Sequence, residues 1–271
     1  MLSCSRDFTN VDKDVVLKRH IQRTLYEVPY SIYRMISSMT IVAGPGLPWH
    51  VEDARMSGPA RTEYSLIFVP EIDKEVHEIQ KHLMYLMDNE ERPKVWMSQL
   101  STRPGSLFGK ANKFTHNVIL EHKDVADATL TRFIDCDLMG TARKIGDTVL
   151  KCLSRQMEKF NDPFKNKAFI FTLSLRGCSE YETFKWINDY FLSKLNARID
   201  FEKSGVLNGH LPKRQITTDP NTRKSAKGGR SLGIYEFNEI LYIEKGRLDG
   251  FYPIFYNDDG GPMLTALVMY K

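Results

Sequence analysis

The clearest alternation of apolar and polar positions lies between Lys167 and Ile199. A run from Ala168 to Leu175 places every second apolar residue on one side, which predicts a β-strand with one buried face. Ser179 and Glu182 follow a break at residues 176–178, and their spacing predicts a capping box at the start of a helix. That helix should pack on the sheet through an apolar stripe at spacings of three and four. The stripe consists of Phe184, Ile187, Phe191 and Leu195.

The N-terminal part of the chain also shows helical periodicity. A first helix is expected to begin near Thr9 or Asp12 and to end near Pro29. A strand at 63–69 should then lead through Pro70 into the most regular helix of the chain, which ends near Asn89. Its expected buried face is Ile72, Val76, Ile79, Leu83 and either Leu86 or Met87.

The remaining pattern is richer in strands than in helices. Strands are expected at 113–122 and 128–138, and a helix should open at Gly140-Thr141. Three further strands, at 232–244, 250–256 and 263–271, close the chain. This pattern predicts an α+β fold in which four or more helices pack on a mainly antiparallel sheet. We expect a mixed helical region at 1–112 and an α+β region at 113–271.

A long stretch at 204–233 has no apolar periodicity and carries six cations. A loop of this length in a compact domain usually has a function. With a formal net charge of only +4, the chain as a whole is not strongly basic. The loop is therefore the predicted contact for a phosphate, a nucleic acid or an acidic partner, or else a solvated charge cluster. Its cations are Lys213, Arg214, Arg223, Lys224, Lys227 and Arg230.

The sequence points to an intracellular setting. Its four cysteines are far apart and form neither a Cys-x-x-Cys pair nor a zinc spacing, so they are expected to be reduced. The first fourteen residues are too polar for a signal peptide, and no apolar run is long enough to span a bilayer. A host cytoplasm or a virion is the expected location.

Two pairs of carboxylates could hold a metal ion. Asp135 and Asp137 stand at i and i+2 near the end of a strand, so their side chains could share one face. Asp258 and Asp259 lie between two apolar runs, but the neighbouring Asn257 and glycines favour a hairpin turn. A solvated turn is also the simpler interpretation of the first pair.

The histidines form no convincing site. His77 and His82 are five residues apart, which does not fit the i, i+4 spacing of a helical zinc site. His116 and His122 lack an acid or a cysteine at ligand spacing, so satisfied or exposed imidazoles are expected. His50 lies in a loop rich in glycine and proline and is the most site-like of the seven. The sequence contains neither a hydrolase nucleophile motif nor a P-loop, and we expect no catalytic residue, no metal and no cofactor.

The C-terminal half resembles the tube-fold proteins of contractile phage tails and baseplates. The resemblance lies in a strand at 170–175, a helix with Tyr181, Phe184, Trp186 and Asn188, and strands at 235–240 and 268–271. It implies a ring of subunits whose sheet edges pair with one another, and it implies no catalysis.

The resulting hypothesis is a non-enzymatic assembly subunit of a virus, which associates with itself or with other assembly subunits. One alternative is a metal-dependent enzyme of phosphoryl or nucleotidyl transfer that uses Asp135 and Asp137. The other is a nucleic-acid-binding protein that uses the 204–233 loop.

Overall fold

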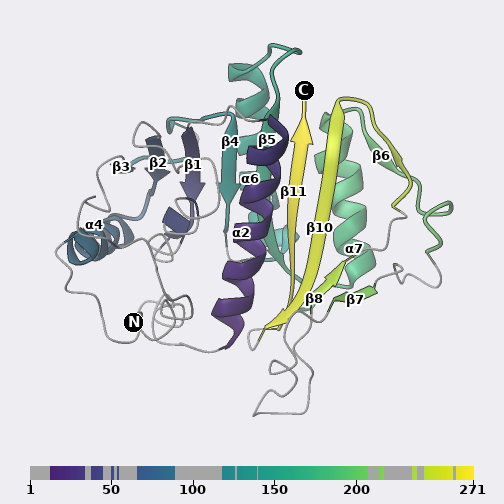
Figure 1. The fold of residues 1–271 in the computed structure, drawn as a ribbon, viewed down its shortest axis with the longest axis horizontal. Helices are drawn as coiled ribbons and strands as arrows, with labels where there is room; N and C mark the ends of the chain where they lie inside the picture. The colour runs from purple at the N-terminus through teal and green to yellow at the C-terminus, as the bar shows by residue number, and fades with distance from the viewer. Residues whose placement is uncertain are drawn as a thin grey trace. The chain divides into compact units, whose positions relative to one another are not determined.

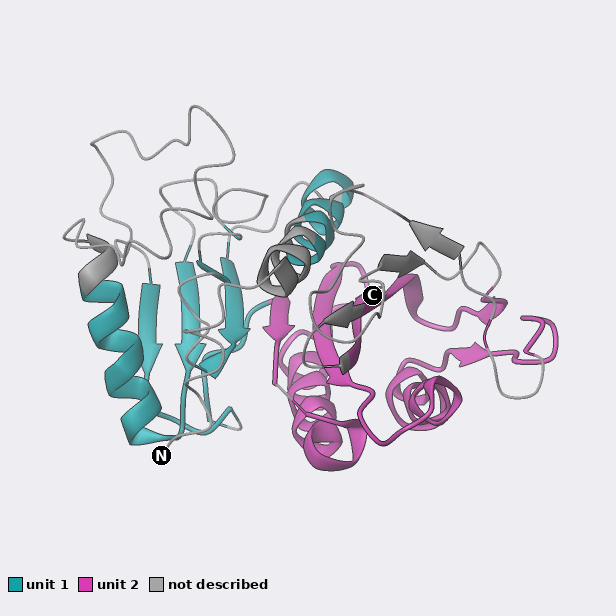
Figure 2. Ribbon diagram, turned by 90° about the horizontal axis from the view of Figure 1, so that it is seen from below, with its two compact units in different colours: residues 1–131 teal, residues 132–271 magenta. Residues whose placement is uncertain are grey.

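The computed structural model divides the chain into two compact units, 1–131 and 132–271, which are coloured separately in Figure 2. The expected division at residue 112 stays a prediction. The structure describes residues 13–33, 38–44, 50–51, 54, 66–88, 118–125, 127–138, 140–206, 211, 214–216, 234–236, 241–258 and 261–271.

Unit 1 contains three short parallel strands. They are β1 (Ser38–Val42), β2 (Leu66–Pro70) and β3 (Val118–Glu121), and they lie side by side in the order β3-β2-β1. Helix α2 (Lys13–Tyr33) precedes β1, and helix α4 (Lys74–Asp88) lies between β2 and β3 in the chain (Figure 1). The carboxyl ends of all three strands therefore face the same edge of this sheet.

Helix α2 does not end near Pro29 as predicted. It continues to Tyr33, although the proline supplies no backbone N–H to the helix. Leu25, Tyr26 and Pro29 are buried side by side, so tertiary packing holds this turn in helical form. The hydroxyl of Ser31 also donates to the carbonyl of Glu27 at 2.8 Å.

Helix α4 buries a different face from the one that its apolar residues predict. Ile72, before its first turn, is 65% exposed, whereas His77 and Gln80 are 5% and 0% exposed. Val76 and Met84 complete the buried face. Two polar side chains therefore lie inside unit 1, where the sequence pattern places aliphatic ones.

Unit 2 begins with a β-α-β segment. Strand β4 (Phe133–Cys136) leads through helix α6 (Ala142–Lys159) to strand β5 (Lys167–Ser174), which runs parallel to β4. Helix α7 (Glu180–Trp186) follows and continues as a π-helical turn, η2 (Ile187–Leu192). The helix end meets the sheet through Phe191, whose ring centroid lies 4.7 Å from that of Phe171.

The C-terminal strands complete the sheet of unit 2. Strand β11 (Gly261–Tyr270) lies antiparallel between β5 and β10 (Leu248–Asp258), and β10 also pairs with β8 (Ile234–Glu236). Strand β7 (Arg214–Ile216) pairs with β8. A separate two-stranded sheet joins β6 (Arg198–Ile199) to β9 (Ile243–Glu244).

The predicted fold class of a mainly antiparallel sheet with helices packed on it is wrong. All the strands of unit 1 are parallel, and unit 2 starts with a parallel pair joined by a helix. The sequence pattern misses this because strands of four or five residues are too short to show a period. Antiparallel pairing occurs where β11 joins β5 and β10, among β10, β8 and β7, and between β6 and β9. The long alternating runs of β5, β10 and β11 made part of it visible in the sequence.

The predicted strand and capped helix at 167–199 are confirmed, but the strand is buried on both faces and not on one, because Ile170 and Thr172 are as fully buried as Phe169 and Phe171. The backbone N–H of Glu182 donates to the Ser179 hydroxyl at 3.1 Å, and the Ser179 N–H donates to the Glu182 carboxylate at 2.8 Å. Among the described helices, none is both long and apolar enough to cross a membrane.

Candidate ligand site at the strand ends of unit 1

Two residues after the first strand of unit 1, the chain passes through a glycine with a left-handed backbone. Gly44 has φ of 49°, and a side chain there would meet no other atom, so the backbone conformation accounts for the glycine. Its carbonyl accepts a hydrogen bond of 2.7 Å from Nε2 of Gln80. Helix α4 thus fixes the point at which the chain leaves β1.

The second strand ends in a carboxylate. Glu71 directly follows β2, and its backbone N–H donates to the carbonyl of Glu121 at 2.9 Å, which ties it to the end of β3. Oε1 of Glu71 accepts the N–H of Asp73 at 2.9 Å. Burial raises the pKa of this carboxyl above its ordinary value and outweighs the opposing effect of its backbone hydrogen bonds.

Two polar atoms on the inner face of α4 lack a hydrogen-bond partner. They are Oε1 of Gln80 and Nδ1 of His77, and both are buried. A buried polar atom without a partner costs about 1–3 kcal/mol, so folds rarely retain one without a use. Because they stand at i and i+3, the two side chains lie on the same face of α4.

His122, at the end of β3, completes the group. Its ring stacks on that of His77 with centroids 5.3 Å apart and an interplanar angle of 28°. Its Nε2 donates to the carbonyl of Ile72 at 3.1 Å. Burial, and then the positive charge of Lys81, lowers the pKa of His77, so this ring is held neutral.

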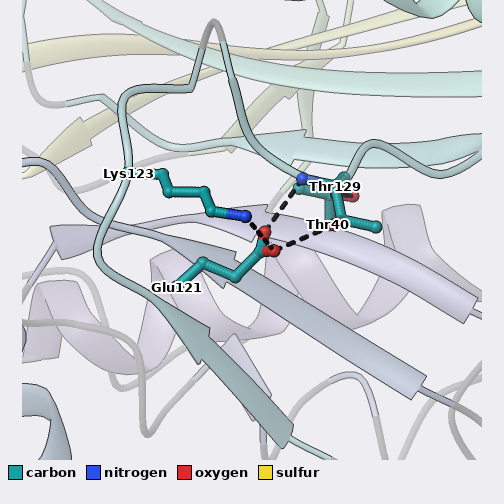
Figure 3. Close-up of polar contacts among 4 residues, drawn as sticks. All are labelled: Thr40, Glu121, Lys123 and Thr129. Carbon is teal, nitrogen blue, oxygen red and sulfur yellow. Dashed lines mark hydrogen bonds and ion pairs between the residues drawn. The ribbon is translucent and has the colours of Figure 1, made fainter.

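A second carboxylate stabilises the end of β3 and does not face a ligand. Glu121 accepts hydrogen bonds of 2.9 Å from both the backbone N–H and the hydroxyl of Thr129, and Lys123 lies 3.4 Å away (Figure 3). Thr40 in β1 donates to the carbonyl of Thr129 at 3.0 Å. These contacts connect the ends of β1 and β3 into a rigid support.

The resulting strand-end site is rich in hydrogen-bond acceptors. Glu71 supplies a carboxylate at the carboxyl end of β2, where parallel strands present ligands, while the amide oxygen of Gln80 and Nδ1 of His77 are buried on α4. Acceptors of this kind suit hydroxyl and amino groups, and a carboxylate favours a cationic ligand over a phosphate. Sequence reasoning missed Glu71 and Gln80. The available signals were an acid directly after a strand and two polar residues, three apart, inside an apolar helical stripe.

His50, the most site-like histidine in the sequence, is a buried structural residue. Its Nδ1 accepts from Nε2 of Gln22 at 3.0 Å and lies 3.3 Å from the hydroxyl of Tyr26, and both partners come from α2.

The paired aspartates lie in unit 2. Asp135, within β4, is 0% exposed, and Asp137, just after it, is 4% exposed. A hydrogen bond with Cys152, burial and the two carboxylates raise the pKa of the Cys136 thiol between them, so this cysteine stays protonated. In the described part of the chain, no three His, Cys, Asp or Glu residues are placed to share a metal ion.

The other predicted site residues are not brought together by the described structure. Arg214 lies on β7, while Lys213, Arg223, Lys224, Lys227 and Arg230 lie outside the described residues. Their proposed contact with a partner stays a prediction. Asp258 ends β10 opposite Gly261, which confirms the hairpin interpretation, and Asp259 is outside the described residues.

No protein family matches this sequence, and a search of curated proteins found no relative. Solved structures with a similar fold include an rRNA methylase from Streptococcus thermophilus, with 9% identity and a TM-score of 0.37 over 96% of this chain and 97% of that one. An S-adenosylmethionine-dependent methyltransferase from Clostridium acetobutylicum has 11% identity and a TM-score of 0.35 over 99% and 82%. A sugar N-methyltransferase from Streptoalloteichus has 9% identity and a TM-score of 0.29 over 98% and 75%.

These structures are methyltransferases and not phage tail proteins, so the resemblance to tail tube and baseplate subunits is wrong. The non-enzymatic viral assembly subunit, expected in a virion, was inferred from that resemblance and is withdrawn with it. Neither alternative, the metal-dependent transferase at Asp135 and Asp137 or the nucleic-acid-binding protein with a basic loop, agrees with these structures. At TM-scores of 0.29 to 0.37, the likeness itself carries no argument about the chemistry of this chain.

Proposed function

We propose that this chain is an S-adenosylmethionine-dependent methyltransferase whose unit 1 binds the adenosine part of that ligand. One observation carries the proposal: the Glu71 carboxylate lies at the carboxyl end of β2, next to the parallel strand β1, which Gly44 follows by two residues. In sheets of parallel strands, an acidic residue at this place accepts hydrogen bonds from the hydroxyls of a ribose.

The acceptors at the strand ends favour a nucleoside over a nucleotide. Glu71 and the buried oxygen of Gln80 would repel a phosphate, and the prolines at 45 and 48 remove two backbone N–H donors from the stretch after Gly44. A pyrophosphate needs such donors, supplied by a glycine-rich turn. A dinucleotide such as NAD is therefore a poorer candidate than a ligand without phosphates.

S-adenosylmethionine is the ligand named for the Clostridium methyltransferase, and it has the properties that this site requires. It carries a ribose with free hydroxyls, an adenine with an exocyclic amino group, and a positive sulfonium. When bound, it supplies an electrophilic methyl group. Glu71 accepts the ribose hydroxyls, and Gln80 holds the carbonyl of Gly44 so that the turn after β1 keeps its shape.

The test is calorimetric titration of the whole chain with S-adenosylmethionine, S-adenosylhomocysteine, NAD and ATP. We expect both adenosyl ligands to bind more tightly than NAD or ATP. Glu71→Ala should weaken that binding about 10- to 150-fold, because it removes hydrogen bonds to a charged acceptor. Glu78→Gln, an exposed change on the same side of unit 1, is the control and should leave affinity unchanged.

Two results would overturn the proposal. One is an unchanged affinity in Glu71→Ala together with a normal melting temperature. The other is tighter binding of NAD or ATP than of either adenosyl ligand.

A further inference from the structure

A second feature lies in unit 2, at the amino ends of β4 and β5. The loop from α6 to β5 lies at the top of Figure 1, near the C-terminal end of β11. It carries Phe164, which is 90% exposed. An aromatic ring this exposed loses the free energy that burial would give it, on the order of 2 kcal/mol. Phe164 is far more exposed than Phe160, at the start of the same loop.

A buried lysine holds this loop in place. Nζ of Lys167 donates to the carbonyls of Asp162 and Lys165, at 3.1 and 2.9 Å, on either side of Phe164. The ammonium also lies 5.5 Å from the centre of the Tyr270 ring. Oδ1 of Asp162 accepts the backbone N–H of Phe164 at 2.9 Å. The turn that projects Phe164 into water is therefore fixed on both sides.

Two cations lie against the ring of Phe160 at the base of this loop. Arg132, just before β4, lies over the ring of Phe160 at 5.5 Å, and Lys159 lies 5.4 Å from the same ring. Nε of Arg132 is buried and has no hydrogen-bond partner. Asp162 is the nearby acid, and it already lies 3.6 Å from the ammonium of Lys165.

The strand pairing brings further positive charge to this end. Lys167 pairs with Tyr270 across β5 and β11, and the N–H of Lys271 donates to the carbonyl of Arg247, just before β10. The ammonium of Lys271 lies 3.3 Å from the carboxylate of Asp249 and is balanced by it. Burial, followed by the charges of Arg247 and Arg132, lowers the pKa of Lys167. These cations therefore repel one another, and a bound anion would relieve that repulsion.

We infer that Phe164, Arg132, Lys159 and Arg247 form a binding surface for single-stranded nucleic acid, at the end of unit 2 opposite to the carboxyl ends of β4 and β5. Phe164 stacks on a base, and the cations bind the adjacent phosphates. An acidic peptide would use the cations but has no flat ring to pair with Phe164, so the exposed aromatic residue favours a nucleic acid. This surface is separate from the 204–233 loop and does not depend on the proposed function.

The test is fluorescence anisotropy with labelled oligouridylate and oligothymidylate of about twelve nucleotides, titrated with the whole chain. We expect Phe164→Ala to weaken binding about 5- to 150-fold, the range for the loss of one stacked base. The matched control is Tyr190→Ala, which removes another exposed aromatic side chain of unit 2. This variant should bind like the unchanged protein.

Salt dependence tests the cations separately. We expect Arg132→Gln to reduce the slope of log affinity against log salt by about 0.7, the value for one lost phosphate contact on a single strand. Arg143→Gln, whose side chain is 77% exposed on α6, should leave the slope unchanged. The melting temperature of each variant, compared with that of the unchanged protein, shows that the variant is folded.

Three outcomes would overturn the inference. They are no binding by the unchanged protein, equal binding by Phe164→Ala, and tighter binding of polyglutamate than of either oligonucleotide. The last outcome, with an effect of Arg132→Gln but none of Phe164→Ala, would assign the surface to an acidic protein partner.

Discussion

The phenol of Tyr270, on the last strand of unit 2, donates a hydrogen bond of 2.7 Å to Oε1 of Gln156 on helix α6. Both residues are buried, and Nε2 of Gln156 in turn donates to the carbonyl of Ala168 in β5. Tyr270 therefore connects β11 to the helix that covers β5, across 114 residues of sequence.

Removing this hydroxyl should destabilise unit 2. Tyr270→Phe keeps the ring but removes a hydrogen bond to a buried amide oxygen, which costs about 1–2 kcal/mol. Urea denaturation followed by circular dichroism measures the free energy of unfolding. Tyr190→Phe, on an exposed ring, is the matched control and should change it by less than about 0.5 kcal/mol. An equal loss in the two variants would contradict this role of Tyr270.

Glu121 should make the stability of unit 1 depend on acid. Burial raises its pKa, but the two hydrogen bonds from Thr129 and the ammonium of Lys123 outweigh burial and lower the pKa below 4.5. The folded state thus binds the proton less readily than the unfolded chain. The stabilisation is complete above about pH 4.5 and is lost as the pH falls through the folded-state pKa.

Glu121→Gln tests this pH dependence. At pH 7 the free energy of unfolding of the variant should be about 1 kcal/mol lower than that of the unchanged protein. The partial exposure of the site keeps this difference small. The difference from the unchanged protein should shrink as the pH falls below about 4.5. Thermal denaturation across a pH series measures it, with the exposed Glu27→Gln on α2 as control. A difference that stays constant with pH would contradict the argument.

Gly146 should resist replacement, although it lies within helix α6. Alanine is favoured over glycine in a helix by about 1 kcal/mol, but a Cβ at this position would lie 2.6 Å from the indole ring of Trp186. Overpacking of this kind costs about 1–3 kcal/mol, so Gly146→Ala should be destabilising.

A double-mutant cycle identifies the cause. Shortening the opposing side chain with Trp186→Leu makes room for the methyl group, so Gly146→Ala should cost less in that background. Chemical denaturation of the four proteins gives the coupling energy. Purely additive losses would mean that contact with Trp186 is not the reason for the glycine.

Ser179 should contribute to stability through its capping box. Ser179→Ala removes the acceptor for the Glu182 N–H, and loss of such a cap costs about 1 kcal/mol. Ser193→Ala, beyond the other end of the same helical segment, removes a hydroxyl that donates to the carbonyl of Asp189, and it should have little effect. Equal effects of both variants on the melting temperature would argue against the cap.

The sequence predicted reliably those features of the fold that depend on residues close together in the chain. The capping box of Ser179 and Glu182, the strand at 167–174 and the β10–β11 hairpin were predictable because neighbouring residues determine them. The direction of the short strands was not predictable, since parallel pairing depends on residues far apart in the chain.

The candidate ligand site was missed for a related reason. The aliphatic residues of α4 outnumber its buried polar ones, so the hydrophobic pattern selected a face with Ile72 instead of the face with His77 and Gln80. Glu71 looked like an ordinary acid before a helix. Only the pairing of β1, β2 and β3 brings these side chains to one edge of the sheet.

The position of β11 between β5 and β10 has a consequence for synthesis on the ribosome. While the chain is being made, the edge of β5 that β11 will occupy stays open until residues 261–270 have emerged, almost ninety residues after β5 itself. The sheet of unit 2 therefore forms only after those residues are translated, whereas unit 1 has all its strands by then. Until that moment, the backbone N–H and C=O groups along this edge of β5 stay unpaired and are exposed to pairing with another chain.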